Sequence, residues 1–505
     1  MRFFEDFPFE GKKSRILWYT CHMLFNSYLF ILLFLPLTLL GYYGLNRRNV
    51  RAGLLWLLAM SLWFYGYYNP VYLLLIGGSV LFNYICSRFL AKEGFAAKKA
   101  LMILAVTANI ALIFFFKYYD FFIGNINALF RTDFAFLHLA LPLGISFFTL
   151  QQISFIVDSY RGKTREYRFL EYALFVTFFP QLVAGPIVLH EELIPQFADP
   201  ERKKFSPENC AKGLMMFTRG LAKKVLIADF FAGAVDPVFA GTQGSSAEFI
   251  LAMFAYTFQI YFDFSGYSDM AVGLGCMCNL TLPCNFDSPY QSLGIAEFWR
   301  RWHMTLGRFL TRYLYIPLGG SRGEKTSRVL LNTMIVFAVS GLWHGANFTF
   351  VLWGILHGLA VCADRLCARY TERLPALLRK CCTFLFVNFC WGLFRATSVS
   401  QFLVICKKLF TLSDLSVSEE FLATLRIPYL RYALTMLHIP YTDMAVFIFS
   451  AVLLFALALF IVWKCRNNYH ATYRYDVRSL VATALLLYVC VISLGRVSVF
   501  LYFNF

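Results

Sequence analysis

The residue best suited to chemistry by its type and setting is His344. It lies in the apolar stretch SGLWHGANFTFVLWGILHG, residues 340–358, beside the small residues Gly345 and Ala346. A titratable side chain at membrane depth is costly and is a functional candidate by default. Small neighbours leave room for a substrate beside the imidazole, so the residues favour catalysis; a structural histidine bonded to a nearby carbonyl is the alternative. His357 is expected to end the following helix and to pack there.

A second candidate segment, AEFWRRWHMTLGRFLTRYLYIPLGGSRG at residues 296–323, is rich in arginine and contains His303. Arg301, Arg308 and Arg312 are spaced i, i+7 and i+11, which places them on one narrow face of an α-helix. We predict one amphipathic helix at the cytoplasmic membrane surface, ended by a proline and two glycines. The arginines would either anchor this helix or bind the phosphates of a cytosolic donor. His303 would assist that site or only bond the backbone.

Two carboxylates interrupt the apolar stretch FQIYFDFSGYSDMAVGLG, residues 258–275. Buried carboxylates such as Asp263 and Asp269 need partners, and an arginine or the imidazole of His344 would serve. The alternative is helix capping at a break near the Ser-Gly pair of this stretch.

Helix-breaking residues also interrupt the apolar stretch FFPQLVAGPIVLHEELIPQF, residues 178–197. Irregular backbone at membrane depth is tolerated only against protein or a water-filled cavity. We therefore expect Pro180, Gly185 and Pro186 to lie in a segment that lines a pocket, with an ordinary kinked helix as the alternative.

The chain that must position these residues has the composition of a membrane protein. Of its 505 residues 59% are apolar and 15% are charged, and the mean hydropathy is +0.60. Soluble chains of this length split into smaller domains, so a soluble enzyme, a nucleic-acid binder and a disordered scaffold fit poorly. The net charge of +17 is explained by lysine and arginine in cytoplasmic loops. The 14 cysteines lack paired metal-ligand spacing, and we expect no metal.

Long apolar runs separated by short charged loops predict an all-α polytopic membrane protein with about 11 transmembrane helices, plus re-entrant and interfacial helices. Basic loops at 47–51 and 92–99 flank two apolar runs, so both loops are expected in the cytoplasm, as is the arginine-rich segment. Residues 1–22 are polar, and the first apolar run begins at Met23. We expect 1–22 to be a dispensable extension and 23–505 to form a single membrane domain.

Six blocks of this chain resemble the membrane-bound O-acyltransferases, and specifically the bacterial branch of alginate and peptidoglycan O-acetylation. The likeness covers nearly all of the chain from Met23. The blocks are VDSYRG (157–162), FFPQLVAGPI (178–187), QIYFDFSGYSDMAVGLG (259–275), NFDSPYQS (285–292), EFWRRWHMTLGRFLTRYLYIPLGG (297–320) and LWHGANFTFVLWGILHG (342–358).

The resemblance implies a ring of transmembrane helices around a central funnel, with His344 as the catalytic histidine and His303 as a second catalytic candidate. It implies acyl transfer, expected to be acetyl transfer, from cytosolic acyl-CoA, which is a donor substrate and not a bound cofactor. The acceptor would be a hydroxyl of an extracytoplasmic polysaccharide or peptidoglycan, reached directly or through an extracytoplasmic partner protein. Asp263, Asp269 and the three arginines are the expected substrate-binding residues. The expected location is the bacterial cell membrane, in contact with lipid and without nucleic acid.

Two other functions compete with this interpretation. D-alanyl transfer from a carrier protein to teichoic acid would require a docking surface for a protein in place of a nucleotide site. A transporter would show inverted repeats and paired broken helices in corresponding halves, and the sequence shows neither.

Overall fold

The computed structural model describes residues 23–164, 167–322, 325–427, 430–496 and 500–501. The expected extension 1–22 lies outside the described residues. The described chain is helical, and its only β-structure is an isolated antiparallel bridge between Phe286 and Trp302. The all-α fold that the sequence predicts is therefore confirmed.

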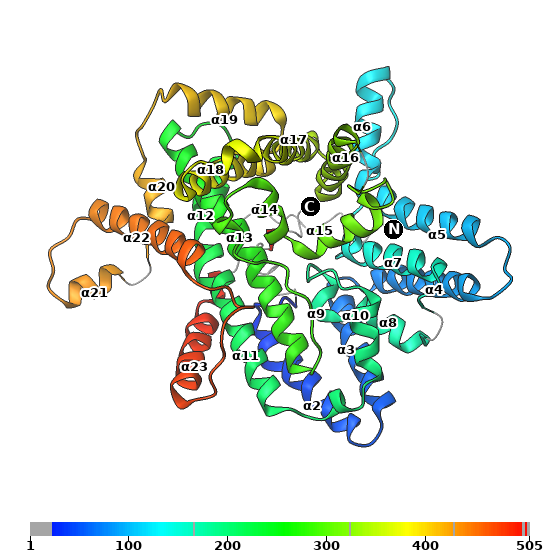
Figure 1. The fold of residues 1–505 in the computed structure, drawn as a ribbon. Helices are drawn as coiled ribbons and strands as arrows, with labels where there is room; N and C mark the ends of the chain where they lie inside the picture. Colours follow the sequence, from blue (N-terminus) through cyan, green and yellow to red (C-terminus); the bar gives the residue numbers. More distant parts are fainter. Residues whose placement is uncertain (1–22, 165–166, 323–324, 428–429, 497–499, 502–505) are drawn as a thin grey trace.

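The helices of the amino-terminal half lie mostly to the right of the centre and below it in Figure 1, whereas α12 lies on the left beside α13. They are η1 (Phe30–Phe34), α2 (Leu35–Asn46), α3 (Val50–Tyr68), α4 (Val71–Ala91), α5 (Lys98–Ile113), η2 (Phe114–Tyr118), α6 (Tyr119–Phe130), α7 (Ile145–Tyr160), α8 (Phe169–Thr177), α9 (Phe179–Leu182), α10 (His190–Ala198), η3 (Glu201–Lys203), α11 (Pro207–Ala222), η4 (Lys223–Ala228) and α12 (Asp229–Phe239).

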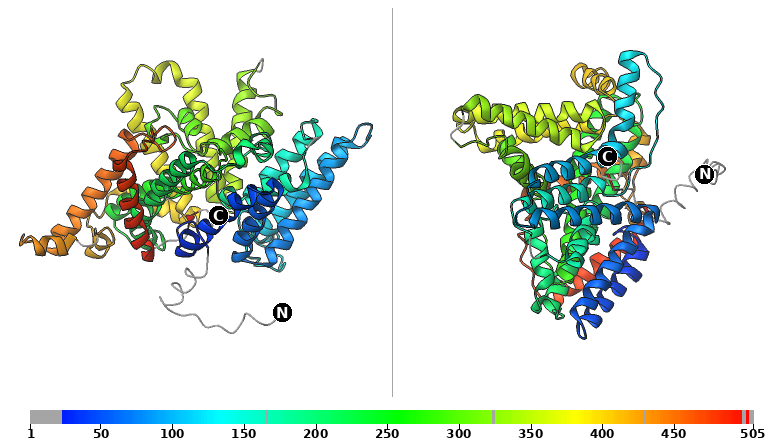
Figure 2. Two further views of the ribbon diagram at one scale, coloured as in Figure 1. Left: turned by 90° about the horizontal axis from the view of Figure 1, so that it is seen from below. Right: turned by 90° about the vertical axis from the view of Figure 1, so that its right-hand side faces the viewer.

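The carboxy-terminal half supplies the central helix and most of the helices above the centre and to its left (Figure 1). They are α13 (Ser246–Met277), η5 (Pro289–Gln291), α14 (Ile295–Arg301), α15 (Met304–Leu310), η6 (Thr311–Tyr315), α16 (Thr326–His344), α17 (Phe348–Thr371), α18 (Ala376–Arg395), α19 (Val399–Thr411), α20 (Glu419–Thr424), α21 (Leu430–Met436), α22 (Asp443–Lys464), α23 (Val477–Ile492) and η7 (Leu494–Arg496). The side views in Figure 2 show long helices running in different directions, unlike a parallel bundle.

Six helical segments of the described chain are long and apolar enough to cross a membrane, by length and composition. They are Val71–Ala91, Lys98–Phe130, Thr326–His344, Phe348–Thr371, Ala376–Arg395 and Asp443–Lys464. Two shorter apolar helices, Phe30–Asn46 and Val477–Ile492, add to them. Leu74 on α4 remains 79% exposed, which suits a surface that faces lipid. These helices confirm a polytopic membrane protein, and the expected count of about 11 crossings stays a prediction.

The centre of the molecule is the 32-residue helix α13, whose side chains are largely buried. It packs on α11 through glycines, as small residues at a helix crossing allow. A Cβ on Gly266 would lie 2.7 Å from the carbonyl oxygen of Gly220, and one on Gly273 would lie 2.6 Å from that of Gly213. The helix break of the capping alternative near Ser265 and Gly266 is therefore absent, because the glycine serves close helix packing.

The arginine-rich segment is not the single helix that its spacing predicts. It divides into α14, α15 and the π-helical turn η6, with His303 between the first two at φ 47°. A left-handed backbone at a non-glycine residue is uncommon and interrupts helical hydrogen bonding. Here it is supported by the bridge between Phe286 and Trp302 and by the hydrogen bond from the Met304 amide to the Asn285 carbonyl, 3.0 Å.

Candidate active site

His344 is the last residue of α16, and its imidazole is enclosed by aromatic rings. The rings of Trp343, Trp353 and Phe394 have their centres 5.0, 5.2 and 5.3 Å from it. The residue is only 4% exposed. The chain leaves the helix at Gly345, where a Cβ would lie 2.2 Å from the ring of Phe350, so a larger residue would displace that ring. Aromatic enclosure keeps bulk water away from this imidazole.

His303 lies near His344 in space although the two are on different helices. Trp343 packs on both imidazoles, with its ring centre 6.0 Å from that of His303 and 5.0 Å from that of His344. The two histidines are also close enough to interact electrostatically. Phe264 on α13 packs on the other side of His303 at 4.8 Å. The structure therefore brings together the two histidines that the sequence singles out as catalytic candidates.

Asn285 determines which nitrogen of His303 carries the proton. Its Oδ1 accepts hydrogen bonds from the amide of Thr305, at 3.3 Å, and from the hydroxyl of Thr305, at 2.9 Å. The backbone N–H of Thr305 can only donate, so the side-chain atom of Asn285 that faces Thr305 and His303 is the oxygen. His303 Nδ1, 3.1 Å away, must then be the donor, which leaves the lone pair of the neutral ring on Nε2.

Burial keeps His303 neutral. The residue is 2% exposed, and loss of hydration lowers its pKa from 6.5 to about 3. Burial disfavours the charged imidazolium, so the ring is neutral throughout the physiological range. A neutral ring with its lone pair on Nε2 can accept a hydrogen bond or a proton.

The helix-breaking segment at 178–197 packs against this histidine block. Its irregular part, residues 183–189, is buried, and the amide of Ile187 donates to the Thr305 hydroxyl at 2.9 Å. Farther along, Glu192 and Gln196 of α10 line a cavity. Pro180, Gly185 and Pro186 do not line this cavity, because the irregular backbone is covered by protein, and only α10 of this segment reaches the cavity.

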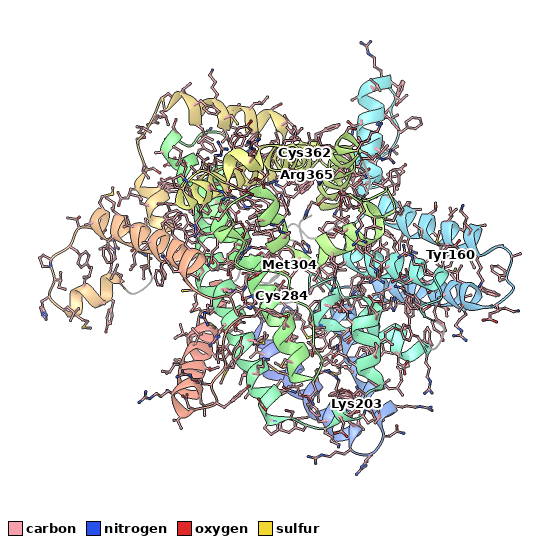
Figure 3. The ribbon with its side chains drawn as sticks, in the orientation of Figure 1. Tyr160, Lys203, Cys284, Met304, Cys362 and Arg365 are labelled. Atoms are coloured by element: carbon pink, nitrogen blue, oxygen red, sulfur yellow. The ribbon has the colours of Figure 1, made fainter. Side chains whose placement is uncertain are left out.

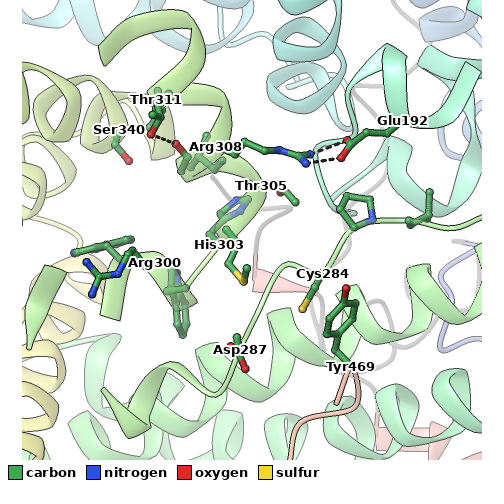
Figure 4. Close-up of a pocket in the computed structure, with 18 of the residues that line it drawn as sticks. Glu192, Cys284, Asp287, Arg300, His303, Thr305, Arg308, Thr311, Ser340 and Tyr469 are labelled. Carbon is green, nitrogen blue, oxygen red and sulfur yellow. Dashed lines mark hydrogen bonds and ion pairs between the residues drawn. The ribbon is translucent and has the colours of Figure 1, made fainter. Parts of the chain in front are cut away.

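The cavity beside His303 has a volume of about 920 Å³, which is at the upper end of the usual range for small-molecule sites, ~300–1,000 Å³. Figure 3 shows two of its lining residues, Cys284 and Met304, near the middle of the molecule. Figure 4 shows Arg300 on the side of the cavity opposite Glu192. Ser340 also lines it, one turn of α16 before His344. The cavity therefore joins the His303 block to the helix that carries His344.

The three arginines predicted to bind substrate are all held by carboxylates. Arg301 pairs with Glu297 at 2.8 Å. Arg308 holds both oxygens of Glu192 (Figure 4). These partners favour the anchoring alternative, because a guanidinium that already holds a carboxylate has less attraction left for a phosphate. Of the three, Arg308 lines the cavity.

Arg312 belongs to a buried cluster around Asp158 that motif reading did not identify. Asp158 accepts from Arg312 and from the Tyr313 hydroxyl, each at 2.8 Å, and pairs with the His190 imidazole at 3.1 Å. Arg312 also pairs with Glu191. His190 has no exposed surface. The sequence signal that could have revealed this cluster is the charged stretch VDSYRG at the end of an apolar helix.

The Asp158 cluster joins three elements of the site wall. Burial raises the pKa of Asp158, but hydrogen bonds from His190 and Tyr313 and the charge of Arg312 outweigh it and lower the pKa to about 2. The ionised carboxylate thus holds α7, α10 and η6 together. Asp158, His190 and Glu191 could group around a metal ion, but Arg312 already occupies the carboxylates.

Asp263 and Asp269 have lysine partners. Lys224 Nζ lies 2.6 Å from Asp263 and 2.7 Å from Asp229, and Lys223 Nζ lies 2.7 Å from Asp269. The expectation that an arginine or His344 would partner them is wrong, because η4 packs its lysines along α13. Neither aspartate lines the cavity, and their substrate-binding role stays a prediction.

His357 lies in the interior of α17 and not at its end. Its Nδ1 accepts a hydrogen bond from the indole of Trp299 at 3.2 Å, and it is fully buried. This contact ties α17 to α14 beneath the cavity. The predicted packing role agrees with the position.

Comparison with known proteins identifies the family. Residues 57–406 match the model of the membrane-bound O-acyltransferase family. A peptidoglycan O-acetyltransferase of Helicobacter pylori is 44% identical over 430 residues, which cover 78% of this chain and 81% of that protein. A probable alginate O-acetylase of Pseudomonas aeruginosa is 38% identical over 405 residues, covering 79% and 76%.

A teichoic acid D-alanyltransferase of Streptococcus thermophilus is 29% identical over 233 residues, which cover 43% of this chain and 55% of that protein. The likeness to the two acetylating relatives is higher and spans far more of the chain. The chain belongs to the membrane-bound O-acyltransferase family and is a multi-pass O-acyltransferase of a bacterial cell membrane.

Proposed function

We propose that this enzyme transfers an acetyl group from cytosolic acetyl-CoA to a hydroxyl of an extracytoplasmic cell-surface polymer, directly or through a partner protein. The observation that carries the proposal is the pair of buried histidines that share Trp343, of which His303 lines a cavity of about 920 Å³. The names of the two acetylating relatives support acetyl as the acyl group and a glycan as the acceptor.

His344 is the general base in this mechanism. Its imidazole takes the proton of the acceptor hydroxyl while that oxygen attacks the carbonyl carbon of the thioester. The carbonyl oxygen becomes an oxyanion, and collapse of this intermediate breaks the carbon–sulfur bond. The imidazolium then returns the proton to the departing thiolate, so the products are the ester and free CoA. His303, which also packs on Trp343, assists, and Asn285 holds the orientation of its ring.

Arg300 is the proposed contact for the phosphates of the donor. It lines the cavity, and no carboxylate in the described chain lies within ion-pair distance of it. Its neighbour Arg301 is engaged by Glu297. A guanidinium with unused donors binds phosphate in a planar, bidentate manner, so Arg300 suits this role better than the three paired arginines.

The test of the proposed function is His344→Ala in purified enzyme, assayed with radiolabelled acetyl-CoA and isolated cell-wall polymer. Loss of a general base costs about 10²–10⁴-fold in rate, so kcat should fall by that factor while membrane insertion and thermal stability remain. Near-normal acetyl transfer by a folded His344→Ala protein would refute the assignment.

His303→Ala and a change of donor complete this experiment. The His303 variant should lose less activity than the His344 variant if His303 only assists, and equal loss would make it a co-equal catalytic residue. A parallel assay with a D-alanyl carrier protein tests the alternative donor, because transfer from the carrier and not from acetyl-CoA would replace acetylation by D-alanylation.

A further inference from the structure

The end of α16, which carries His344, lacks the usual means of closing a helix. The last four carbonyl groups of an α-helix have no partner within the helix and need donors from elsewhere. Many helices supply these donors through a left-handed residue just past the end. Here the following residue, Gly345, is extended, with φ −171° and ψ 157°, so the backbone does not fold back to donate.

Two side chains from a different helix supply the missing donors. Lys117 Nζ donates to the carbonyl oxygens of Trp343, at 2.7 Å, and of His344, at 3.1 Å. The neighbouring Tyr118 hydroxyl donates to the carbonyl oxygen of Leu342 at 2.6 Å. Three consecutive carbonyls at the end of α16 are thereby capped by two adjacent residues of η2.

Lys117 is a costly residue in its position. It is the only charged residue between Lys99 and Asp120 in the candidate membrane span Lys98–Phe130. Ionisable residues within spans are rare and usually mark functional sites. It also lies on η2, a π-helical turn inside a longer helix, and such turns are frequent at functional sites. The extra residue of the π-turn changes the helical register and brings Lys117 and Tyr118 together toward α16.

We propose that Lys117, with Tyr118, is a positioning residue that holds the His344 end of α16 in the geometry required for acyl transfer. The amine holds the carbonyls of the two peptide groups on either side of the His344 α-carbon, and it also lies 5.9 Å from the centre of the Trp343 ring. The catalytic consequence rests on the proposed role of His344, whereas the cap itself does not.

The experiment compares Lys117→Met with Lys99→Met, which removes an exposed lysine from the same continuous helix. Hydrogen–deuterium exchange of residues 340–347 is measured in detergent, together with kcat and KM for acetyl-CoA. Lys117→Met should speed exchange in this segment roughly tenfold or more, because the two hydrogen bonds from Lys117 to the end of α16 are lost. Its kcat should fall about 100-fold, the cost of a small misplacement of a reacting group, with KM within about twofold. Lys99→Met should change neither.

Lys117→Arg and Tyr118→Phe refine the result. Arginine keeps the hydrogen-bond donors, so kcat of Lys117→Arg should be at least ~10-fold higher than kcat of Lys117→Met. Tyr118→Phe should speed exchange near Leu342 by a smaller factor than Lys117→Met does. If Lys117→Met is too unstable to purify, these two variants carry the test, and normal exchange at 340–347 in Tyr118→Phe would then count against the cap.

Exchange at 340–347 that is equal in Lys117→Met and Lys99→Met would overturn the proposal. Slow turnover with unchanged exchange would show that Lys117 acts through its charge and not by positioning. Activity retained by His344→Ala would refute the catalytic base while leaving the exchange result intact, so the two failures can be told apart.

Discussion

At the scale of single residues, the site depends on hydrogen bonds that select one form of a side chain. His303 presents Nε2 as an acceptor only because Asn285 Oδ1 faces Nδ1, and Asn285 is itself oriented by two donors of Thr305. The neutral state of His303 follows from burial. A change at Asn285 should therefore alter the chemistry of the site without removing either histidine.

Asn285→Asp tests this dependence through pH. A carboxylate at the position of the amide favours the imidazolium and raises the His303 pKa above its present value of about 3. Below the raised pKa the ring is protonated and cannot accept, so the acid limb of the pH–rate profile should move to higher pH. Ser268→Ala, which removes the acceptor for the Asn285 side-chain nitrogen, should leave the profile in place. An unshifted acid limb in a folded Asn285→Asp enzyme would exclude an essential neutral His303.

Arg300→Gln tests the contact with the donor. Removing a phosphate contact that is the same in the ground and transition states raises KM and leaves kcat unchanged. We expect the KM for acetyl-CoA to rise about tenfold at low salt, the equivalent of one charge-assisted hydrogen bond, and the difference to shrink at high salt. Arg301→Gln is the matched control, since Arg301 is paired with Glu297. Equal KM values for the two variants would reject the role of Arg300.

At the scale of elements, the walls of the site are joined by charges from helices distant in sequence. Arg308 reaches Glu192 across 116 positions of the chain, and Arg312 reaches Asp158 across 154. These pairs attach α15 and η6 to α10 and α7. Local spacing predicted one shared helix face for the three arginines, but the break at His303 divides them among α14, α15 and η6, and spacing could not reveal the carboxylates that they meet.

Asp158→Asn should destabilise the enzyme and remove part of its acid sensitivity. Breaking a buried pair by removing one charge costs about 3–5 kcal/mol. Because the folded pKa of Asp158 is lowered to about 2 from 3.8, its stabilisation is complete above pH 4 and is lost as pH falls toward 2. The melting temperature of the native enzyme between pH 2 and 5 measures this loss. The melting temperature of Asp158→Asn should fall less over the same pH range.

The control for the Asp158 cluster is Glu297→Gln, which breaks the partly exposed pair with Arg301. Pairs of this kind contribute about 0–1 kcal/mol, so its melting temperature should stay close to that of the native enzyme. If Asp158→Asn melts no lower than Glu297→Gln, the cluster does not hold these elements together.

At the scale of the whole molecule, the orientation in the membrane follows from charge. The loops at 47–51 and 92–99 and the arginine-rich segment are expected on the cytoplasmic side, which is where acetyl-CoA is found in the proposed function. The cavity is lined by residues of that arginine-rich segment, so a donor from the cytoplasm would meet it first.

Single cysteines at Arg48, Glu93 and Arg322, placed in a cysteine-free background, test this orientation. A membrane-impermeant thiol reagent added to intact cells should not label them, whereas the same reagent should label all three in inverted vesicles. Labelling of Arg322→Cys in intact cells would place the arginine-rich segment outside and would contradict a cytosolic donor.

The sequence by itself determined the class of the molecule and its candidate histidines. Composition requires a membrane protein because this much apolar surface cannot be buried in a soluble core. The motif blocks resemble one family, and the comparisons confirm it. His344 was visible because an isolated imidazole in an apolar stretch has few structural explanations.

Only the tertiary structure decided how those residues work together. The helix break at His303 depends on a left-handed backbone supported by Phe286 and Asn285, which local helix periodicity does not encode. Arg308 and Arg312 pair with carboxylates far along the chain. Lys117 donates hydrogen bonds to carbonyl groups 226 and 227 positions away. Such contacts arise from packing between helices, and packing depends on the whole chain whereas sequence spacing describes only neighbours.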